Sequence, residues 1–436
     1  MSQNKSIWSE TVEKPQFSAL EGDKKTDVLV IGGGIAGVLC LHRLKNAGVD
    51  AILVEAKEIC DGITKNTTAK LTVQHGLIYD KIIKKYGKEA AEMYFVAQDS
   101  ALKEYRRLCA EINCDFEEKA SFVYSLDDCK KILREYEALQ SIGRPAVFSS
   151  KANIPLSFAG AVGIEHQAQF NPLKFLYGIA SGLPIFEDTK VIELRGNVAL
   201  TNRGKILFQK AIVATHFPFM NKYGSYFLKM YQHRSYVLGL EGAPDIDGMY
   251  VDEDLKGLSF RNYEGLLLFG GGSHRTGKQG GGWQELRDLA KLYYPRAKVV
   301  TQWATQDCIT LDGIPYIGLY SSKLADIYVI TGFNKWGMTS SMAGAMVLAD
   351  LVAGKKNDFA GVFSPQRSIL HSQLLLNGAE SILNLITPTT PRCSHLGCAL
   401  KYNKQEHTWD CPCHGSRFTD KGEVIDNPAT DDKKNI

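Results

Sequence analysis

A glycine-rich turn close to the amino terminus constrains the fold of this chain more than any other feature. An apolar, β-branched run at residues 26–31 leads directly into a Gly-x-Gly-x-x-Gly motif at residues 32–37, and a helical pattern of apolar residues follows. A second apolar run, at residues 51–54, ends on Glu55. This order of strand, glycine turn, helix and strand predicts a parallel βαβ unit, and therefore a Rossmann-like α/β domain.

The three glycines of this motif have different physical roles in a dinucleotide site. Gly32 allows the tight turn, Gly34 lets a pyrophosphate approach the backbone, and Gly37 lets helix and strand pack closely. The amino terminus of the helix offers N–H groups and a positive dipole end to the phosphates. Glu55 stands where a carboxylate can accept hydrogen bonds from ribose hydroxyls. We therefore expect a bound dinucleotide, with a glycine turn that binds no ligand as the alternative.

Length and composition restrict the class of protein. At 436 residues the chain exceeds what one hydrophobic core usually supports, so two or three domains are expected. The formal net charge of +3 gives no reason to expect nucleic acid as a partner. No stretch approaches the ~18 apolar residues of a membrane span, and residues 1–25 lack the apolar run of a secretory signal. We expect no transmembrane segment and a cytoplasmic location.

The rest of the chain alternates between helical and strand patterns. A long amphipathic helix is predicted over residues 80–112, and a helix of small residues over 340–353. A strand at residues 266–269 is expected to stop at the glycines 270–272. The other predicted strands lie at residues 122–124, near 154–166, at 210–215 and at 327–330.

A dense group of cysteines and histidines lies near the carboxyl terminus. It reads Cys393-Ser394-His395-Leu396-Gly397-Cys398 and, twelve residues later, Cys411-Pro412-Cys413-His414-Gly415-Ser416. Cys-x-His and Cys-x-x-His each place one thiolate and one imidazole on a tight loop, as a cluster with two thiolates on one iron and two imidazoles on the other requires. Tetrahedral zinc is the alternative, although zinc does not call for the two further cysteines.

This pattern resembles the Rieske signature of cytochrome bc-type complexes. The resemblance implies a 2Fe-2S cluster in which Cys393 and Cys411 bind one iron and His395 and His414 bind the other. It also implies a Cys398–Cys413 disulfide that ties the two loops together. Ser416 matches a serine whose hydroxyl bonds to cluster sulfur, and Phe418 falls where high-potential members carry a tyrosine.

The support for the two loops looks shortened in comparison with a full Rieske domain. Only 22 residues follow His414, and the residues between Gly361 and Cys393 offer mostly a helical pattern. That pattern consists of Leu374, Leu375, Ala379, Ile382, Leu383 and Leu385. Either this is a minimal module that leans on the rest of the chain, or the site holds iron poorly.

Three separated segments resemble the D-amino-acid-oxidase and glycine-oxidase superfamily of FAD-dependent oxidoreductases. They are residues 28–55, residues 211–216, in which His216 replaces a usual glycine, and the Asp-Gly-x-Pro motif at 312–315 with the loop 331–339. In that family this loop begins a helix whose positive end faces the flavin. Cys308 lies near a position of covalent flavin attachment, but it is displaced and is expected to be a core thiol.

The resemblance implies FAD and a set of residues that bind it. These are Gly32, Gly34, Gly37, Glu55, Thr64, Thr67, Thr68, Val191 through its backbone, Thr215, Gly332, Gly337, Met338 and Thr339. The alternative for the threonines of residues 62–70 is a solvated polar loop.

The implied fold class is α/β (α+β): a Rossmann-like FAD-binding domain with an inserted antiparallel-sheet substrate domain, plus a small C-terminal Rieske-type iron–sulfur module. An FAD-dependent oxidoreductase is expected at 24–365, with FAD-binding parts at about 24–80, 150–222 and 305–356. Substrate-domain parts are expected at about 81–149 and 223–304. A helical linker at 366–391 and the module at 392–436 follow.

A flavin accepts two electrons from an organic substrate, whereas a Rieske cluster carries one. We therefore expect oxidation of an amine or amino-acid C–N bond, with electrons passed singly to an acceptor protein or quinone. The catalytic candidates are Arg261, His274 and Lys70, beside Tyr236 and Tyr263 in the substrate domain. Arg261 could bind a carboxylate bidentately or form a surface ion pair. The alternative function is an electron-transfer flavo-iron–sulfur protein that has no small amine substrate.

Overall fold

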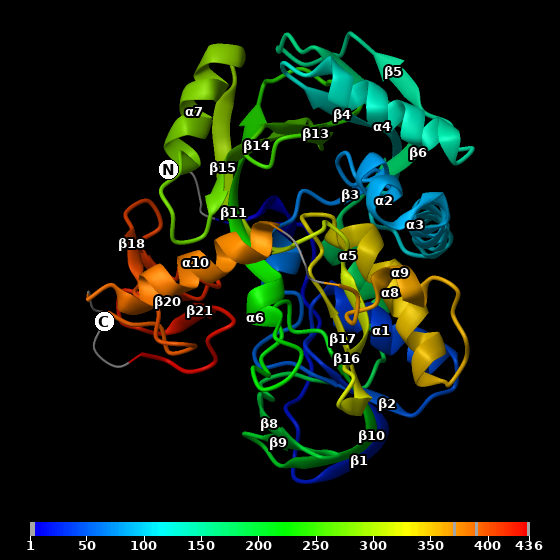
Figure 1. Cartoon of the computed structure of the whole chain (residues 1–436), viewed down its shortest axis with the longest axis vertical. Helices are drawn as coiled ribbons and strands as arrows, with labels where there is room; N and C mark the ends of the chain where they lie inside the picture. Colours follow the sequence, from blue (N-terminus) through cyan, green and yellow to red (C-terminus); the bar gives the residue numbers. More distant parts are fainter. Residues whose placement is uncertain (1–4, 369–371, 389–390, 434–436) are drawn as a thin grey trace.

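The computed structural model of the chain describes residues 5–368, 372–388 and 391–433 (Figure 1). Within these residues the chain forms sheets of eight, nine and four strands. The predicted linker falls partly outside the described residues, at 369–371 and 389–390, as does the end of the predicted module, at 434–436. None of the helices in the described part of the chain is both long and apolar enough to cross a membrane.

The eight-stranded sheet carries the predicted βαβ unit. Its main order is β16-β17-β10-β1-β2-β7, in which β17, β10, β1, β2 and β7 run parallel. The strands are β1 Lys24–Ile31, β2 Ala51–Val54, β7 Ile185–Phe186, β8 Val191–Arg195, β9 Val198–Thr201, β10 Lys205–Val213, β16 Tyr316–Ser321 and β17 Leu324–Thr331. Strand β2 and the second half of β1 are buried throughout, as expected for parallel strands with helices on their faces.

Two helices cover one face of this sheet and pack against each other. They are α1 (Ile35–Asn46) and α8 (Gly337–Val352), each of which follows a parallel strand directly. Helix α5 (Pro172–Ala180) packs beside α1, with the short helices η1 (Ile7–Glu10) and η2 (Ile63–Asn66) near it. The amino ends of α1 and α8 therefore lie at the carboxyl edge of the sheet, where nucleotide sites form.

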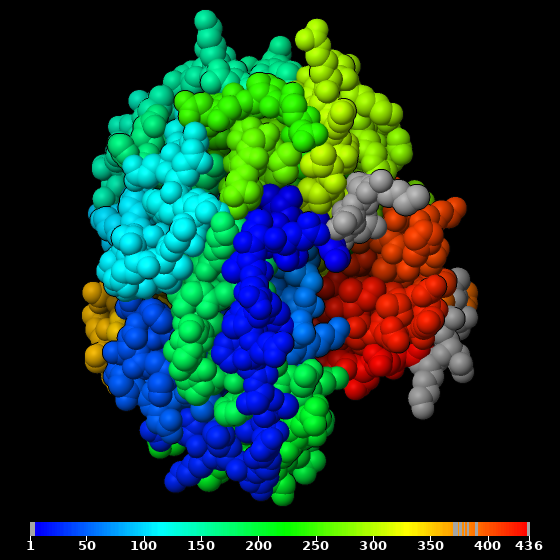
Figure 2. All heavy atoms as spheres, turned by 180° about the vertical axis from the view of Figure 1, so that it is seen from behind, coloured from blue at the N-terminus to red at the C-terminus, as the bar shows by residue number. Residues whose placement is uncertain are grey.

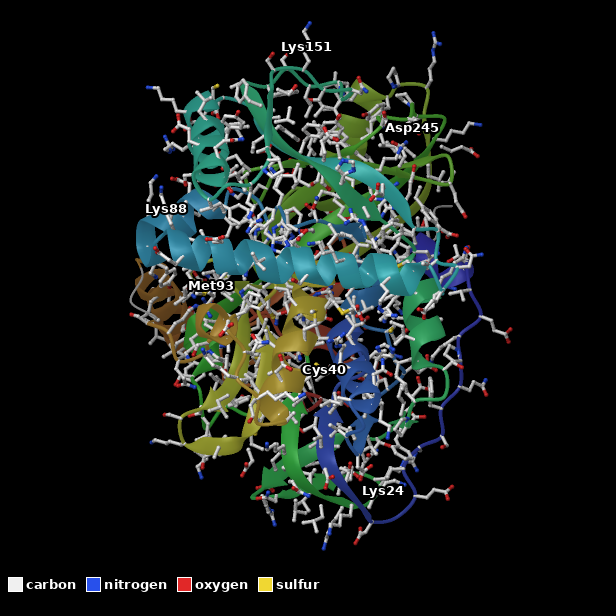
Figure 3. The ribbon with its side chains drawn as sticks, turned by 90° about the vertical axis from the view of Figure 1, so that its right-hand side faces the viewer. Lys24, Cys40, Lys88, Met93, Lys151 and Asp245 are labelled. Atoms are coloured by element: carbon white, nitrogen blue, oxygen red, sulfur yellow. A yellow bond between two sulfur atoms is a disulfide. The ribbon has the colours of Figure 1, made fainter. Side chains whose placement is uncertain are left out.

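The nine-stranded sheet lies beyond this edge and has the main order β15-β11-β14-β13-β12-β4-β6-β3. It is antiparallel except where β12 pairs with β4. The strands are β3 Lys70–Leu71, β4 Glu117–Ser125, β5 Val147–Ser149, β6 Gly160–Gln169, β11 Met230–Glu241, β12 Met249–Asp252, β13 Ser259–Tyr263, β14 Leu266–Arg275 and β15 Lys298–Thr310. The helices around it are α2 Tyr79–Tyr86, α3 Lys88–Cys109, α4 Cys129–Ser141 and α7 Gly282–Tyr293. Figure 3 shows α3, with Lys88 and Met93 labelled, crossing between the two sheets above Cys40 of α1.

Two predicted boundaries were wrong, and glycine explains both. The helix expected over residues 80–112 is broken into α2 and α3 at Gly87, whose φ is +89°. The strand expected to stop at residues 270–272 continues as β14 to Arg275. A Cβ at Gly270 would lie 2.4 Å from the Ser259 hydroxyl, so this glycine permits close packing within the sheet and does not end the strand.

The carboxyl-terminal residues form a small antiparallel sheet in the order β18-β19-β20-β21. The strands are β18 Lys401–Asn403, β19 Thr408–Asp410, β20 Arg417–Thr419 and β21 Val424–Asp426. The sequence predicted that most of the sheet beneath the two cluster loops is absent, whereas the structure has four strands there. Helix α10 (Ser372–Ile386) precedes the module where a helical pattern was predicted, although the side chains of Leu375, Ala379 and Ile382 lie outside the described residues.

The carboxyl-terminal module packs directly on the larger body of the protein. In Figure 1 it lies beside β11, and α10 contacts the short helix α6 (Tyr226–Lys229). The short helix α9 (Ala360–Phe363) packs against β16 in the larger body. Figure 2 shows its orange and red surface flush against neighbouring segments in blue and yellow-green. The contacts described below join it to β11, β15 and the loop after β10.

Candidate functional site

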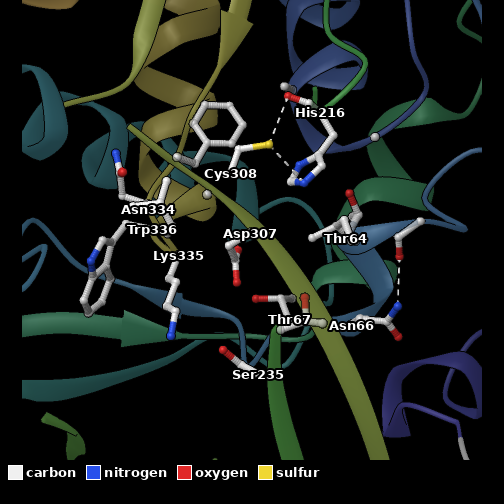
Figure 4. Close-up of a pocket in the computed structure, with 18 of the residues that line it drawn as sticks. Thr64, Asn66, Thr67, His216, Ser235, Asp307, Cys308, Asn334, Lys335 and Trp336 are labelled. Carbon is white, nitrogen blue, oxygen red and sulfur yellow. Dashed lines mark hydrogen bonds between the residues drawn. The ribbon is translucent and has the colours of Figure 1, made fainter. Parts of the chain in front are cut away.

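A cavity of about 1390 Å³ lies between the carboxyl edge of the eight-stranded sheet and the nine-stranded sheet. Its walls include Gly32 and Glu55, which follow β1 and β2, and Ser235 and Asp307 from β11 and β15. Figure 4 shows part of its lining. This volume exceeds that of a typical small-molecule pocket and suits an extended dinucleotide together with a substrate.

The glycine turn has the geometry that a pyrophosphate site requires. Gly32 has a φ of +110°, and a Cβ at Gly37 would lie 1.8 Å from the Gly32 carbonyl oxygen. Gly34 is the N-cap of α1 and has no side chain of its own, the Thr64 hydroxyl accepts from the Ile35 N–H at 3.0 Å, and Gly34, Ile35 and Ala36 line the cavity. The amino end of α1 is thus open toward the cavity, where its dipole and N–H groups favour phosphate.

Glu55 is held in place by the same turn. Its carboxylate accepts hydrogen bonds from the backbone N–H of Gly33 at 2.6 Å and of Lys57 at 2.9 Å. Burial raises the pKa of Glu55, and these N–H groups act in the opposite direction. A carboxylate has about four acceptor sites, so Glu55 can still accept hydrogen bonds from ribose hydroxyls.

Most of the residues predicted to bind FAD line this cavity. They are Gly32, Gly34, Glu55, Thr64, Thr67, Thr68, Val191, Thr215, Gly337 and Met338. Gly37 lies behind the turn as a packing position. Gly332 and Thr339 do not line the cavity: a Cβ at Gly332 would meet Thr310, and the Thr339 hydroxyl donates to Thr72 O at 2.9 Å. The donor set and the shape of the turn fit FAD.

Two predicted catalytic residues lie outside the cavity. Arg261 is fully buried and donates to the carbonyls of Thr68 at 2.7 Å and Ala69 at 2.8 Å. It therefore holds the backbone of the loop before β3, and it is neither a surface ion pair nor placed to bind a carboxylate. His274 bonds to the Tyr236 hydroxyl at 3.1 Å and to its neighbour's carbonyl. Of this pair only Tyr236 lines the cavity.

Lys70, the third predicted catalytic residue, does line the cavity. Its ammonium donates to the Thr68 hydroxyl at 3.1 Å. Burial, and then the positive charge of Arg261, lowers the pKa of Lys70 to about 7. An amine with this pKa can hold or release a proton at neutral pH.

Asp307 and Lys335 are candidate site residues that sequence reasoning missed. Both line the cavity, and Figure 4 shows them pointing into the same region. Burial raises the pKa of Asp307 to about 6, although Lys335 and Arg234 act against it, and burial lowers the pKa of Lys335 to about 8. The Asp307 carboxylate has no hydrogen-bond partner in the described part of the chain. The Lys335 ammonium donates to the Leu255 carbonyl at 2.9 Å.

The backbone around Lys335 is strained. Asn334 and Lys335 have φ values of +54° and +72°, immediately before α8. Strain of this kind in non-glycine residues is concentrated at functional sites. The available signal was the position of Lys335 within the loop 331–339, whereas Asp307 lies among the other polar residues of β15, which nothing in the sequence distinguishes.

The carboxyl-terminal loops bring the four predicted iron ligands together. The thiols of Cys393 and Cys411 are close enough to interact, and the His395 and His414 rings lie 5.0 Å apart. Both nitrogens of His414, and Nδ1 of His395, are buried without a hydrogen-bond partner among the described residues. The other nitrogen of His395 bonds to Asn221 Oδ1 at 2.7 Å. Unsatisfied imidazole nitrogens beside two thiols fit a Rieske-type cluster.

The two additional cysteines form the disulfide that the resemblance implied. Cys398 and Cys413 are bonded with a Cα–Cα distance of 6.7 Å. Their sulfur atoms lie within 4.8 Å of the Cys411 sulfur. Ser416 is fully buried, and its hydroxyl is hydrogen-bonded to the Cys393 thiol. The disulfide and this hydroxyl both stabilise the two loops in one arrangement.

A buried ion-pair network fixes the module to the nine-stranded sheet. Arg417 of β20 pairs with Asp410 at 3.0 Å, Asp426 at 3.0 Å and Glu406 at 2.8 Å, and Glu406 also pairs with Arg234 of β11. Burial would raise the pKa of Glu406, but the two guanidinium groups lower it to about 2. The network therefore keeps its charges at neutral pH.

The module also forms part of the cavity wall. Arg417, Asp426 and Asn427 line the same cavity as the glycine turn. The Asn427 amide donates to the carbonyl oxygens of Thr215 and Phe217, on the loop after β10. The flavin-type cavity and the iron-binding module are thus in direct contact.

The fold and the site define a flavin enzyme with an iron–sulfur domain, because a Rossmann-type sheet with a phosphate-binding turn is joined to a cluster-binding module. Comparison with known proteins agrees with this class. The family model "FAD dependent oxidoreductase" matches residues 27–351, and "Rieske [2Fe-2S] domain" matches residues 370–436. The chain belongs to the FAD-dependent oxidoreductase family and carries a Rieske domain. Its cofactors are accordingly FAD and a 2Fe-2S cluster.

Individual relatives span most of the chain. The Bacillus subtilis (strain 168) protein YhfW, named as a Rieske 2Fe-2S iron–sulfur protein, is 34% identical and matches 98% of this chain and 97% of its own. Gamma-glutamylputrescine oxidoreductase of Escherichia coli (strain K12) is 23% identical over 79% of this chain and 87% of its own. Glycine oxidase from Geobacillus kaustophilus has a similar fold, with a TM-score of 0.67 at 19% identity, over 79% of this chain and 99% of that structure.

Proposed function

We propose that this protein oxidises the C–N bond of a small amine or amino acid and passes the electrons singly, through its Rieske cluster, to an external acceptor. The observation that carries this proposal is the shared wall: Asp426 and Asn427 of the module line the same cavity as Gly32 and Glu55. Two redox groups held on either side of one wall suit electron transfer between them. The names of the similar proteins, an amine oxidoreductase and a glycine oxidase, support the substrate class.

Charged side chains on the substrate side of the cavity suit an amine. The Asp307 carboxylate is free to accept hydrogen bonds from an ammonium group, and such charge-assisted bonds are about twice as strong as neutral ones. The Lys335 ammonium lines the same cavity. It has three N–H donors, and among the described residues it donates one hydrogen bond, to the Leu255 carbonyl. Asp307 and Lys335 would bind and orient the substrate, and Lys70, with a pKa of about 7, would take up or release a proton.

When bound, FAD supplies an acceptor for the two electrons and the hydrogen lost from the carbon next to nitrogen. The protein's residues orient the substrate, and the walls exclude water from the reacting carbon. Oxidation of one amine to an imine releases two electrons, so two equivalents of a one-electron acceptor are required for each turnover. A protein or a quinone would serve as this acceptor.

The test is anaerobic mixing of the purified holoprotein with a panel of amines and amino acids, while flavin absorbance and cluster absorbance are recorded together. The proposal expects at least one compound to bleach the flavin, followed by bleaching of the cluster. If a reduced carrier protein bleaches the flavin and no amine or amino acid does so, the protein is an electron-transfer flavo-iron–sulfur protein and the proposal is wrong.

A further inference from the structure

Both histidine rings of the module contact the larger body of the protein, and His414 is buried there whereas His395 is half-buried. His414 is 2% exposed, and its ring meets that of Phe227 at 5.9 Å. The His395 ring lies 6.4 Å from that of Phe217, and its Nε2 bonds to Asn221. The side of the module that carries the imidazole ligands is therefore the side that is docked.

Two fully buried glutamines bridge the cavity side of the nine-stranded sheet to these loops. The Gln232 amide, on β11, donates to the carbonyl oxygens of His414 at 3.0 Å and Asn427 at 2.7 Å. The Gln306 amide, on β15, donates to Gly415 O at 2.9 Å and to the side-chain oxygen of Gln232 at 2.7 Å. Both side chains are at most 1% exposed, so the bridge excludes water.

The other end of this bridge reaches the cavity wall at His216. Its imidazole Nε2 lies 3.4 Å from Cys308 Sγ, and His216 and Cys308 both line the cavity. Gln232 and Cys308 are direct partners in the β11–β15 ladder, which fixes these side chains side by side. Figure 4 shows His216 and Cys308 together at one side of the cavity.

The backbone at His216 is also tied to the module. His216 has a φ of +62°, which is unusual for a residue with a side chain. The carbonyls on either side, of Thr215 and Phe217, accept hydrogen bonds from Asn427 of the module, and the His216 carbonyl accepts from the Thr331 hydroxyl. The strained conformation is thus fixed by contacts from both the flavin domain and the module.

We infer that His216, Gln232 and Gln306 form a positioning bridge that holds the His414 loop against the cavity wall and connects the flavin side to the cluster side for internal electron transfer. This inference rests on the proposed function and names the residues that couple its two halves. Buried amides stabilise a fold less well than apolar side chains unless every polar atom is bonded, and bonded amides fix one geometry. Here the Gln306 amide donates to Gln232 and to Gly415, and the Gln232 amide donates to the backbone carbonyl of the iron ligand His414.

Each internal transfer moves one electron. The reduced flavin loses one electron, and the oxidised cluster gains it. A one-electron acceptor must then reoxidise the cluster before a second transfer returns the flavin to its oxidised form, and the protons of the reduced flavin leave to solvent. The bridge residues themselves gain and lose no electrons overall.

The test uses light in place of a substrate. Anaerobic holoprotein is flashed in the presence of EDTA, a sacrificial donor that lets the excited flavin become reduced, and electron arrival at the cluster is followed by absorbance and electron paramagnetic resonance. The variants are Gln232→Leu and Gln306→Leu. The matched control is Gln302→Leu, a buried glutamine on the same strand β15 whose side-chain oxygen accepts a hydrogen bond from Arg287.

We expect internal transfer at a rate independent of protein concentration in the wild type and in Gln302→Leu, and slower transfer in both bridge variants. Gln232→Leu removes two buried hydrogen bonds to the module. This lowers the equilibrium constant between the docked and undocked module by about 5- to 150-fold. Amide hydrogen exchange over residues 411–416 should accelerate accordingly. If Gln232→Leu fails to retain its cluster, Gln306→Leu, which leaves the two Gln232 bonds in place, decides the outcome.

Equal transfer rates in the wild type and both bridge variants would overturn the bridge and leave the proposed function standing. Absence of internal transfer in the wild type would overturn the electron-passing half of the proposed function as well. Because no amine is present, neither outcome depends on the identity of the substrate. The two failures are therefore distinguishable.

Discussion

The FAD-binding sheet and the carboxyl-terminal module are stabilised in different ways. Parallel strands such as β1 and β2 are buried between layers and contribute to a core that extends through α1, α5 and α8. In the described part of the module, the apolar core cluster consists of seven buried residues: Cys393, Cys398, Leu400, Cys411, Cys413, Phe418 and Ala429. Four of the seven are cysteines that belong to the disulfide or the cluster site. The larger sheet is held by apolar burial, whereas the module depends on cross-links.

The comparison shows how a shortened module can remain folded. Domains below about 40 residues usually require disulfides, metals or a partner surface. This module has the Cys398–Cys413 disulfide, a cluster site and a buried ion-pair network shared with Arg234 of β11. Of the two possibilities left by the sequence, the structure supports the module that leans on the rest of the chain.

The largest expected effect comes from breaking the network at its centre. Arg417→Met leaves Glu406, Asp410 and Asp426 buried with too little positive charge, and loss of one partner of a buried pair costs about 3–5 kcal/mol. We expect the purified variant to lose its iron–sulfur absorbance and keep its flavin absorbance. The control is Arg195→Met, which breaks an exposed pair with Glu193. Retention of the cluster in Arg417→Met would show that the module does not depend on this network.

The next effect concerns the cavity that both regions share. Asp307→Asn removes a charged acceptor for the substrate ammonium, and a hydrogen bond to a charged group contributes about 1.5–3 kcal/mol. The dissociation constant of an amine substrate should therefore rise about 10- to 150-fold. Equilibrium titration of flavin absorbance measures it, with the exposed Asp326→Asn as control. Unchanged affinity would remove Asp307 from the substrate site.

A steric change separates the FAD-binding region from the module. Gly37→Ala places a methyl group where a Cβ would lie 1.8 Å from Gly32 O, and overpacking typically costs about 1–3 kcal/mol. We expect loss of FAD with the cluster retained, the opposite of the Arg417→Met result. Gly361→Ala, at a position with open space, is the control. A spectrum with normal flavin content in Gly37→Ala would contradict the assigned turn.

The pH dependence of substrate use should report on the two charged side chains proposed to bind the substrate, Asp307 and Lys335. Asp307, with a pKa of about 6, is ionised above that pH, and Lys335, with a pKa of about 8, is charged below that pH. Against the effect of burial, the positive charge of Arg234 lowers the pKa of Asp307, and the negative charge of Asp254 raises the pKa of Lys335. We expect kcat/KM to be highest between pH 6 and 8 and to fall about tenfold per pH unit outside it. A profile with no acidic limb would contradict the role of Asp307.

The smallest expected effect is a change in the midpoint potential of the cluster alone. Phe418 is fully buried in the module core, where high-potential Rieske proteins carry a tyrosine. In Phe418→Tyr a hydroxyl that donates to cluster sulfur favours the reduced cluster by about 0.5–1.5 kcal/mol, which corresponds to roughly 20–60 mV in a one-electron couple. Redox titration should show a raised midpoint potential. An unchanged or lowered midpoint would contradict this role for residue 418.

Local patterns predicted the parts of the molecule in which neighbouring residues determine the geometry. The glycine turn, α1 and the cluster loops each depend on a short segment, and their spacing identified them. Arg261 could not be assigned in this way, because its partners, Thr68 and Ala69, are nearly 200 residues away in sequence. Asp307 is one of several polar residues of β15, and only the folded sheet places its carboxylate at the cavity.

The sequence of any single segment also could not predict where the module packs on the larger body. The bridge joins Gln232, Gln306 and His414, which come from two strands and one loop of separate domains. Nothing in the sequence around either glutamine distinguishes it from an ordinary polar residue of a strand. Long-range hydrogen bonds of this kind depend on the register of β11 and β15, which the fold as a whole determines.

The central claim is that the flavin supplies electrons to the cluster within one molecule. The most direct measurement is rapid freeze-quench electron paramagnetic resonance after anaerobic mixing with a substrate from the amine panel, with flavin absorbance followed in parallel. The predicted result is flavin reduction first, then a reduced-cluster signal whose rate does not change with protein concentration. A flavin that is fully reduced by substrate while the cluster stays oxidised would contradict the account.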